Sequence, residues 1–119
     1  MHRNAPISIF LLTLLSVAVC SCDPKSKFAK KRQIAVCQEN QGMVTFETFL
    51  YADSTFYQPG NPLIDYSYGR FQLSENGILF KIDGGGKNLC NSYRFDSSKR
   101  FLYAEYGCSS DHLDFYPSK

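Results

Sequence analysis

The stretch Val44–Tyr51, which reads VTFETFLY, decides the fold class of this 119-residue chain. Two sets of side chains alternate along it, and β-branched and aromatic residues dominate both sets. One set is Val44, Phe46, Thr48 and Leu50, and the other is Thr45, Glu47, Phe49 and Tyr51. A period of two is typical of a half-buried β-strand, whereas an amphipathic helix repeats its apolar residues every three or four positions. The turn signal Ala52-Asp53-Ser54 follows directly, and a second strand pattern covers residues 55–57. The stretch therefore predicts a strand, a tight turn and another strand.

The same pattern recurs through the rest of the chain. Further strands are expected at residues 66–73, 78–82, 92–95, 101–106 and 113–116. Clusters of turn-forming residues separate them, and Asn76-Gly77 and Asp83-Gly84 are the strongest hairpin signals. No stretch keeps apolar residues at helical spacing over two turns. We therefore predict an all-β domain, an antiparallel meander of about seven or eight strands that closes into a small barrel or folds into a sandwich, with the barrel favoured.

Part of this pattern resembles a known group of proteins. The residues concerned are Phe49-Leu50-Tyr51-Ala52-Asp53-Ser54-Thr55-Phe56, Tyr68-Gly69-Arg70-Phe71-Gln72-Leu73 and Ile78-Leu79-Phe80. They are similar to the L-x-x-D-S-T-F, G-x-W/F-x-L and L-x-L motifs of small lipocalin-like lipoproteins of Bacteroidota. The resemblance covers residues 49–82, about a third of the chain, and Phe71 stands where many members have Trp. It implies a lipocalin-like β-domain on a membrane-anchored protein, and it implies no chemistry.

The N-terminus has the composition of a secretory signal peptide. Residues 7–19 form an apolar run that is interrupted only by Ser8, Thr13 and Ser16. A membrane-spanning helix needs about 20 apolar residues, so this run is too short to span a bilayer. We expect residues 1–21 to form a signal helix that is removed, and residues 33–119 to form a single folded domain.

Two cysteines, Cys20 and Cys22, follow the apolar run. The lipoprotein-specific peptidase requires cysteine as the first residue of the mature chain, because that thiol receives a diacylglyceryl group. Cys22 fits this rule better, since the small Ser21 precedes it and the aliphatic Val19 lies three positions before it. The region resembles the lipobox of bacterial lipoproteins, from which Cys20 is the departure. The resemblance implies that Cys22 carries the lipid, palmitate included, and that the mature protein is stably anchored.

Residues 22–32 hold five basic residues against one acid, and we expect them to form a solvated tether. Because these charges lie close to the acyl chains, they could equally rest on anionic lipid head groups. Two other interpretations stay open, namely ordinary secretion with cleavage near Ser21 and a eukaryotic secreted precursor processed at Lys30-Lys31-Arg32. From residue 33 onward the chain carries seven basic against ten acidic residues, which argues against a nucleic-acid partner.

Three cysteines, Cys37, Cys90 and Cys108, remain in the predicted domain. A secretory compartment permits one disulfide among them. A hairpin centred near Lys99 would bring Cys90 opposite Cys108, and we favour this pair. The alternative pair, Cys37 with Cys108, would tie the first strand to the last. In the favoured pairing Cys37 is a buried apolar thiol on the first strand.

Residues that commonly carry chemistry are few. His112 lies beside Asp111, and a polar turn residue is favoured over a metal ligand or a base, because a zinc site needs three or four converging ligands. The glycine-rich run at residues 83–88 lacks the spacing of a phosphate loop, so a flexible hairpin loop is favoured over a nucleotide cradle. We therefore expect no metal, no cofactor and no catalytic residue.

The roles of the carboxylates and tyrosines depend on where the fold places them. The candidate carboxylates are Asp53, Asp65, Glu75 and Glu105, and they would support a hydrolase only if two of them met in a cleft. The tyrosines lie at positions 51, 57, 66, 68, 93, 103, 106 and 116. Their amphipathic rings could line an open barrel mouth or a protein interface, although half-buried strand positions explain most of them.

These observations favour a non-enzymatic, membrane-anchored binding protein of the cell envelope, with a protein or a small apolar ligand as its partner. The expected location is the outer membrane of a Gram-negative bacterium, with the domain in the periplasm or outside the cell. The alternatives are an inhibitor or immunity-type protein that binds an enzyme such as a lysozyme, and a hydrolase that uses paired carboxylates. A deep apolar cavity would favour a small ligand, whereas a filled core with exposed tyrosines would favour a protein.

Overall fold

The computed structural model describes residues 23–109 and 111–119. In this part of the chain a short helix, α2, precedes eight strands. The elements are α2 (Lys25–Phe28), β1 (Gln33–Gln41), β2 (Val44–Tyr51), β3 (Thr55–Gln58), β4 (Ser67–Leu73), β5 (Gly77–Gly85), β6 (Ser92–Phe95), β7 (Phe101–Ala104) and β8 (His112–Pro117). The predicted signal peptide and Cys22, the predicted lipidation site, lie outside the described residues.

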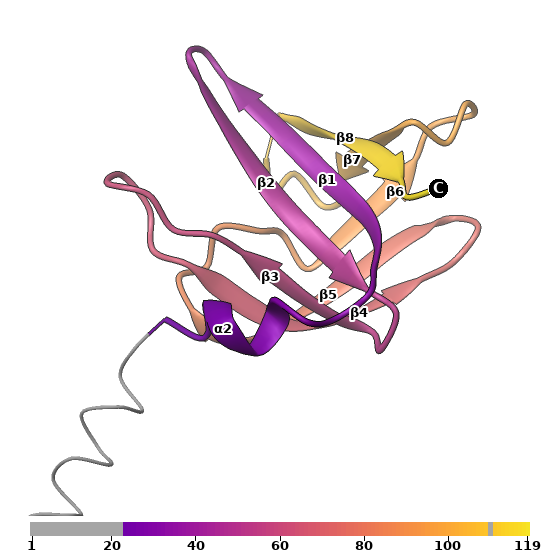
Figure 1. Cartoon of the computed structure of the whole chain (residues 1–119). Coiled ribbons are helices and arrows are strands. Elements are labelled where there is room, and N and C mark those ends of the chain that lie inside the picture. The colour runs from indigo at the N-terminus through magenta and orange to yellow at the C-terminus, as the bar shows by residue number, and fades with distance from the viewer. Residues whose placement is uncertain (1–22, 110) are drawn as a thin grey trace, which may run out of the picture.

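The eight strands form a closed barrel in chain order (Figure 1). Each strand is antiparallel to the next, and β1 pairs with β8 to close the barrel. This closing pair sets Cys37 opposite Phe115 and Val36 opposite Tyr116. Closure gives each of the eight described strands a neighbour on both sides, which is how small antiparallel sheets avoid edge-to-edge association. The predicted meander and its closure into a barrel are confirmed, and the sandwich alternative is wrong.

Most strands lie within a few residues of their predicted bounds, and β1 and β7 are the informative exceptions. The sequence pattern gave no bounds for β1, because its apolar residues lie next to one another instead of alternating. Its pairing with both β2 and β8 makes this segment a strand. β7 ends at Ala104, two residues before the predicted end, because Tyr106 and Gly107 take positive φ angles of 61° and 68° and turn the chain.

Of the two strongest hairpin signals, one is right and one is wrong. Asn76-Gly77 lies in the turn between β4 and β5, where the Ser74 N–H donates to the Gly77 carbonyl at 2.9 Å. Asp83-Gly84 instead continues β5, and Gly84 pairs with Tyr68 across the ladder. A Cβ atom on Gly84 would overlap the Tyr68 side chain, so this glycine leaves room for that ring. The loop expected at residues 83–88 is strand as far as Gly85.

The β6–β7 hairpin is one residue away from the predicted register. A centre at residue 99 implies Phe95 opposite Tyr103, whereas Phe95 pairs with Leu102. Asp96 sets this difference, because its N–H donates to the Phe101 carbonyl at 3.0 Å and its carboxylate accepts from the Phe101 N–H at 3.1 Å. A side chain that hydrogen-bonds across its own turn fixes the loop length, and the loop length fixes the register.

Candidate functional site

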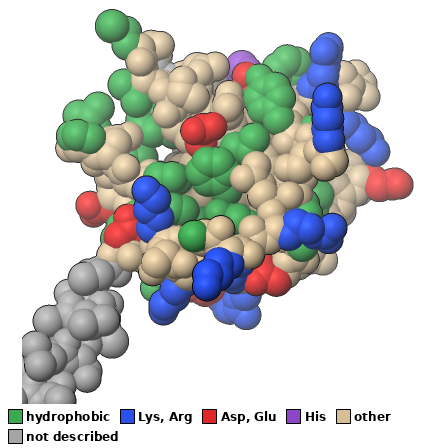
Figure 2. Space-filling model, in the orientation of Figure 1, with side chains coloured by type: hydrophobic (Ala, Val, Ile, Leu, Met, Phe, Trp, Pro, Cys, Tyr) green, Lys and Arg blue, Asp and Glu red, His purple; other side chains and the backbone are tan. Residues whose placement is uncertain are grey.

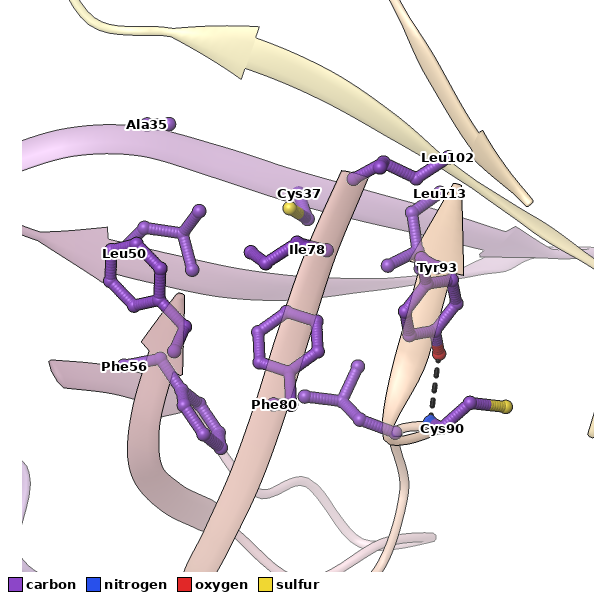
Figure 3. Close-up of a cluster of buried hydrophobic side chains, with 12 residues drawn as sticks. Ala35, Cys37, Leu50, Phe56, Ile78, Phe80, Cys90, Tyr93, Leu102 and Leu113 are labelled. Carbon is purple, nitrogen blue, oxygen red and sulfur yellow. Dashed lines mark hydrogen bonds between the residues drawn. The ribbon is translucent and has the colours of Figure 1, made fainter. Parts of the chain in front are cut away.

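The barrel interior is the first place to look for a ligand site, and a cluster of buried apolar side chains occupies most of it (Figure 3). Every strand contributes to this core, which consists of Ala35, Cys37, Leu50, Phe56, Phe71, Ile78, Phe80, Leu89, Cys90, Tyr93, Leu102 and Leu113. Phe80 meets Phe56 and Tyr93 edge-on, with ring centroids 5.1 and 5.8 Å away. Edge-to-face rings of this kind are typical of a close-packed core. This arrangement favours binding on the outside of the barrel.

One row of the interior is polar. Thr48, Gln58 and Ser67 belong to β2, β3 and β4, and all three are buried. The Gln58 Nε2 donates to Thr48 Oγ1 at 3.3 Å, and the Ser67 hydroxyl donates to the Gly86 carbonyl at 2.5 Å. The Oε1 of Gln58 is a buried acceptor that receives no hydrogen bond from any described residue. A buried acceptor without a donor costs stability, so Gln58 lowers the free energy of unfolding of an otherwise apolar core.

The positions of the cysteines settle their pairing. Cys90 and Cys108 form a disulfide with their Cα atoms 6.0 Å apart, as predicted. The alternative pair of Cys37 with Cys108 is wrong, because Cys37 is a fully buried free thiol in the core. Burial raises the pKa of the Cys37 thiol to about 12, so this group stays protonated and is a poor nucleophile at neutral pH.

Two residues in the left-handed conformation allow this disulfide despite the shifted β6–β7 register. Beyond the strands, the Glu105 N–H donates to the Ser92 carbonyl at 3.0 Å, which would set Cys90 opposite residue 107. Tyr106 and Gly107 both have positive φ angles, so the chain turns there and Cys108 reaches Cys90 instead. The disulfide thus closes the open end of the β6–β7 hairpin.

Alternate residues of β7 and β8 form an outward surface that we term the aromatic face. Its members are Phe101, Tyr103, His112, Asp114 and Tyr116, and the register sets Tyr103 opposite His112 and Phe101 opposite Asp114. The His112 ring contacts both neighbouring rings, with centroid distances of 5.3 Å to Phe101 and 5.5 Å to Tyr103. Tyr103 and Tyr116 remain 49% and 48% exposed. This face is therefore an apolar surface with polar tips.

Polar contacts fix the side chains of the aromatic face. His112 Nε2 lies 3.2 Å from Asp114 Oδ1, and the Tyr116 hydroxyl donates to Asp114 Oδ2 at 3.5 Å. His112 was predicted to be a turn residue, but it is the first residue of β8, where cross-strand pairing places it against aromatic rings. In the described part of the chain, no group of three His, Cys, Asp or Glu residues could hold a metal ion.

A surface groove of about 470 Å³ adjoins the aromatic face. Phe101, Asp114 and Tyr116 line it from the face, and Lys99 and Arg100 line it from the β6–β7 turn. The groove thus combines aromatic side chains with both signs of charge. An apolar centre with a charged rim, enriched in tyrosine and arginine, is the composition of protein recognition surfaces.

The tyrosines separate into groups with different surroundings. Tyr93 belongs to the core, and its hydroxyl accepts a hydrogen bond from the Cys90 N–H at 2.9 Å. Tyr51 and Tyr57 are buried on the outside of the barrel, whereas Tyr103 and Tyr116 of the aromatic face are about half exposed. The tyrosines therefore do not gather at one barrel mouth, which was one of the possible positions for them. Alternation within β7 and β8 indicated which side chains share a side, but only their register shows that they form one surface.

Residues 23–32, which we term the strap, pack on the outer wall formed by β2, β3 and β4. Phe28 is only 8% exposed, and its ring stacks on Tyr51 and Tyr57 with centroids 5.4 and 5.1 Å away. Phe28 also approaches Tyr68, at 6.4 Å between ring centroids. The expectation of a solvated tether is wrong for this segment. Its one aromatic residue covers a group of tyrosines that the barrel core cannot cover.

Polar contacts fix both ends of the strap. The Tyr57 hydroxyl donates to Asp23 Oδ1 at 2.6 Å, and Lys31 Nζ donates to Asp53 Oδ2 at 2.6 Å. The same Lys31 Nζ lies 4.9 Å from the centroid of the Phe28 ring, a cation–π contact. The hydrogen bond from Lys31 lowers the pKa of Asp53, while burial and the contact with Asp23 raise the pKa of Tyr57. At neutral pH both groups therefore hold the protonation states that these contacts require.

Two of the four candidate carboxylates have basic neighbours. Asp53 binds Lys31, and Glu105 accepts from the Ser92 hydroxyl at 2.7 Å and lies 3.8 Å from Arg94. The other two, Asp65 and Glu75, are exposed in loops. A hydrolytic pair needs one carboxyl group with a raised pKa, whereas hydrogen bonds from Lys31 and Thr55 lower that of Asp53.

The chain matches no family model, and comparisons with curated proteins and with solved structures found no significant match. Within the described residues, no helix has the length and apolar character needed to cross a membrane.

Proposed function

We propose that this chain is a non-enzymatic lipoprotein of the cell envelope, anchored through Cys22, which binds a protein partner through its aromatic face. One contrast carries the proposal: apolar side chains occupy the barrel interior, whereas Tyr103 and Tyr116 stand half exposed on a face whose residues Phe101 and Tyr116 line a groove. Tyrosine is enriched at protein interfaces because it offers a large apolar surface and a polar tip. A small apolar ligand would instead need an internal cavity.

The anchor and the location rest on the N-terminal sequence. The apolar run at residues 7–19 and the small Ser21 before Cys22 support export and lipidation. The disulfide between Cys90 and Cys108 fits an oxidising compartment outside the cytosol. We place the domain in the periplasm or at the cell surface, held to the outer membrane of a Gram-negative bacterium, among the lipocalin-like lipoproteins that its motifs resemble.

An inhibitor or immunity-type protein is the second candidate. A closed barrel with a disulfide across one hairpin is a rigid frame, and a preorganised surface binds with little loss of conformational freedom. The aromatic face would then enter the cleft of the target enzyme, for example a lysozyme. The hydrolase alternative has less support, because hydrogen bonds lower the pKa of Asp53.

Capture from envelope extracts with the full lipoprotein tests the binding surface. The double variant Tyr103→Ser with Tyr116→Ser should lose the partner that the wild-type protein captures. Leu79→Ser is the matched control, because Leu79 is an apolar residue on β5 that is 52% exposed. Equal capture by all three proteins would place the binding surface elsewhere.

Labelling with palmitate tests the anchor separately. Cys22→Ser should abolish incorporation of labelled palmitate and release the protein from the membrane fraction, because no other residue then occupies the predicted acylation position. Cys20→Ser should remain labelled and membrane-bound. A Cys22→Ser protein that still takes up palmitate would overturn the assignment of the anchor.

A further inference from the structure

The strap is attached to the barrel at its start, in its middle and at its end. Asp23 accepts a hydrogen bond from the Tyr57 hydroxyl, and Phe28 stacks in the middle on the tyrosine wall. At the far end, the Arg32 carbonyl accepts from the Ala52 N–H at 2.9 Å. Residue 23 is therefore held against the barrel wall, with no free linker between them.

The strap uses one of its five basic side chains to attach itself, because Lys31 binds Asp53. The other four, whose residues are exposed, are Lys25, Lys27, Lys30 and Arg32, which we term the basic ridge. The acid of the strap, Asp23, is engaged by Tyr57. Figure 2 shows Lys and Arg side chains gathered along the lower edge of the molecule, where Figure 1 shows α2. The strap thus presents a compact surface of positive charge beside the point where the chain continues to Cys22.

We propose that the basic ridge binds the head groups of anionic phospholipids, so that the wall of β2, β3 and β4 faces the membrane. This inference rests on the proposed function, because Cys22 is bonded directly to Asp23 and an acyl chain on Cys22 places the ridge at the bilayer surface. Basic residues beside an anionic leaflet each raise the affinity for it by about fivefold. Because the strap is attached to the barrel, this attraction orients the whole domain.

The orientation determines what the aromatic face can reach. The strap covers Tyr57 on β3, and the aromatic face begins on β7. These two strands lie four steps apart in a closed barrel of eight strands, so they occupy opposite sides. The aromatic face therefore points away from the membrane, toward proteins in the surrounding compartment.

Quenching by brominated lipid tests this orientation on the acylated protein. The chain contains no tryptophan, so Ser26→Trp on α2 and Tyr106→Trp beyond β7 each supply a single probe. The lipoprotein is reconstituted into vesicles of brominated phosphatidylcholine, with and without phosphatidylglycerol. We expect the Trp at position 26 to be quenched and the Trp at position 106 to fluoresce as in water, with the difference growing as phosphatidylglycerol is added.

Substitution of basic residues distinguishes binding by the basic ridge from a general attraction between the protein and anionic lipid. In the Ser26→Trp protein, replacement of Lys25, Lys27 and Lys30 by Gln should remove the dependence on phosphatidylglycerol, since each lost charge weakens the preferred orientation by about fivefold. The matched control replaces Lys81, Lys99 and Arg100, which are also exposed, and should keep that dependence.

The outcomes distinguish the two proposals. A protein that carries palmitate and sediments with vesicles, but whose two probes are quenched equally, would overturn the orientation and leave the anchor standing. A protein without palmitate that stays in solution would overturn the anchor and the orientation together. If quenching at position 26 does not change with the phosphatidylglycerol content of the vesicles, the proposed role of the basic ridge is overturned.

Discussion

Two opposite walls of this barrel carry outward-facing aromatic side chains, and only one wall is covered. On the wall of β2 and β3, Tyr51 and Tyr57 are 7% and 3% exposed because Phe28 of the strap stacks on both. On the opposite wall, Tyr103 and Tyr116 are about half exposed, and no segment of the described chain lies over them. The described part of the chain therefore covers one aromatic surface and leaves the other exposed.

The difference indicates that different parts of this small barrel provide stability, hold the N-terminal segment and expose a surface to other proteins. Its interior is packed with apolar side chains, so it contributes stability. The covered wall fixes the position of the N-terminal segment, and the open wall offers a surface to other proteins. Each of the following changes alters one wall and leaves the other as it is, and their expected effects run from large to small.

Removal of the disulfide should have the largest effect, because it loosens the hairpin that supports the open wall. The bond joins residues 18 positions apart, and a loop of this size contributes about 3 kcal/mol by restricting the unfolded chain. The double variant Cys90→Ser with Cys108→Ser should lose about this much free energy of unfolding in urea titrations. Cys37→Ala removes a thiol but no cross-link and is the control; an equal loss in both would contradict this account.

Phe28→Ala should lower the free energy of unfolding by about 2 kcal/mol, because it uncovers the tyrosine wall. The loss stays below the full value for a core phenylalanine, since the strap lies at the end of the domain and can detach without unfolding the barrel. Thermal unfolding followed by circular dichroism measures the change. Tyr106→Ala is the control, because Tyr106 is 93% exposed, and it should change stability by less than about 0.5 kcal/mol.

The ion pair of the strap should make the covered wall sensitive to acid. The folded protein lowers the pKa of Asp53, so the stability that this carboxylate contributes is present above its ordinary pKa of about 4 and is lost as the pH falls through the folded value. Asp53→Asn should lower stability at pH 7 by less than about 1 kcal/mol, because the pair is partly exposed. The melting temperatures of variant and wild type should converge below about pH 4. A constant difference at every pH would assign the stabilisation to another contact.

The smallest effect on stability is expected on the open wall. Tyr103→Ser with Tyr116→Ser removes side chains that are half exposed, so the free energy of unfolding should change by less than about 0.5 kcal/mol for each substitution. If the double variant no longer captures the partner but keeps its stability, these tyrosines act in binding. A drop of several degrees in melting temperature would instead show that they hold the barrel together.

The sequence predicts the barrel because its information is local and periodic. Alternation within Val44–Tyr51 and the turn residues at Asn76-Gly77 specify strands and a hairpin without any knowledge of tertiary contacts. Asp83-Gly84 shows the limit, because the same dipeptide that favours a tight turn also permits a strand to approach the Tyr68 ring. The pairing of Cys90 with Cys108 was predicted from a register that is wrong by one residue, and the turn at Gly107 compensates for the difference.

The two outer walls could not be predicted because they depend on contacts between distant segments. Phe28 lies among basic residues that indicate a solvated tether, and its partners Tyr51 and Tyr57 lie over 20 positions along the chain. The aromatic face likewise requires the register of β7 with β8, which no local pattern specifies. A lone aromatic residue in a charged segment before a β-domain was the available signal for the strap.

Nitration of tyrosine by tetranitromethane, followed by peptide mapping, tests the contrast between the walls most directly. In the wild-type protein Tyr103 and Tyr116 should react readily, although more slowly than the fully exposed Tyr106. Tyr51 and Tyr57 should be protected, because burial beneath Phe28 excludes the reagent and raises the pKa of both phenols. In Phe28→Ala, Tyr51 and Tyr57 should become reactive while Tyr103 and Tyr116 react as before. Nitration of Tyr51 and Tyr57 at the rate of Tyr103 in the wild-type protein would contradict the account, since the strap would then leave both walls equally open.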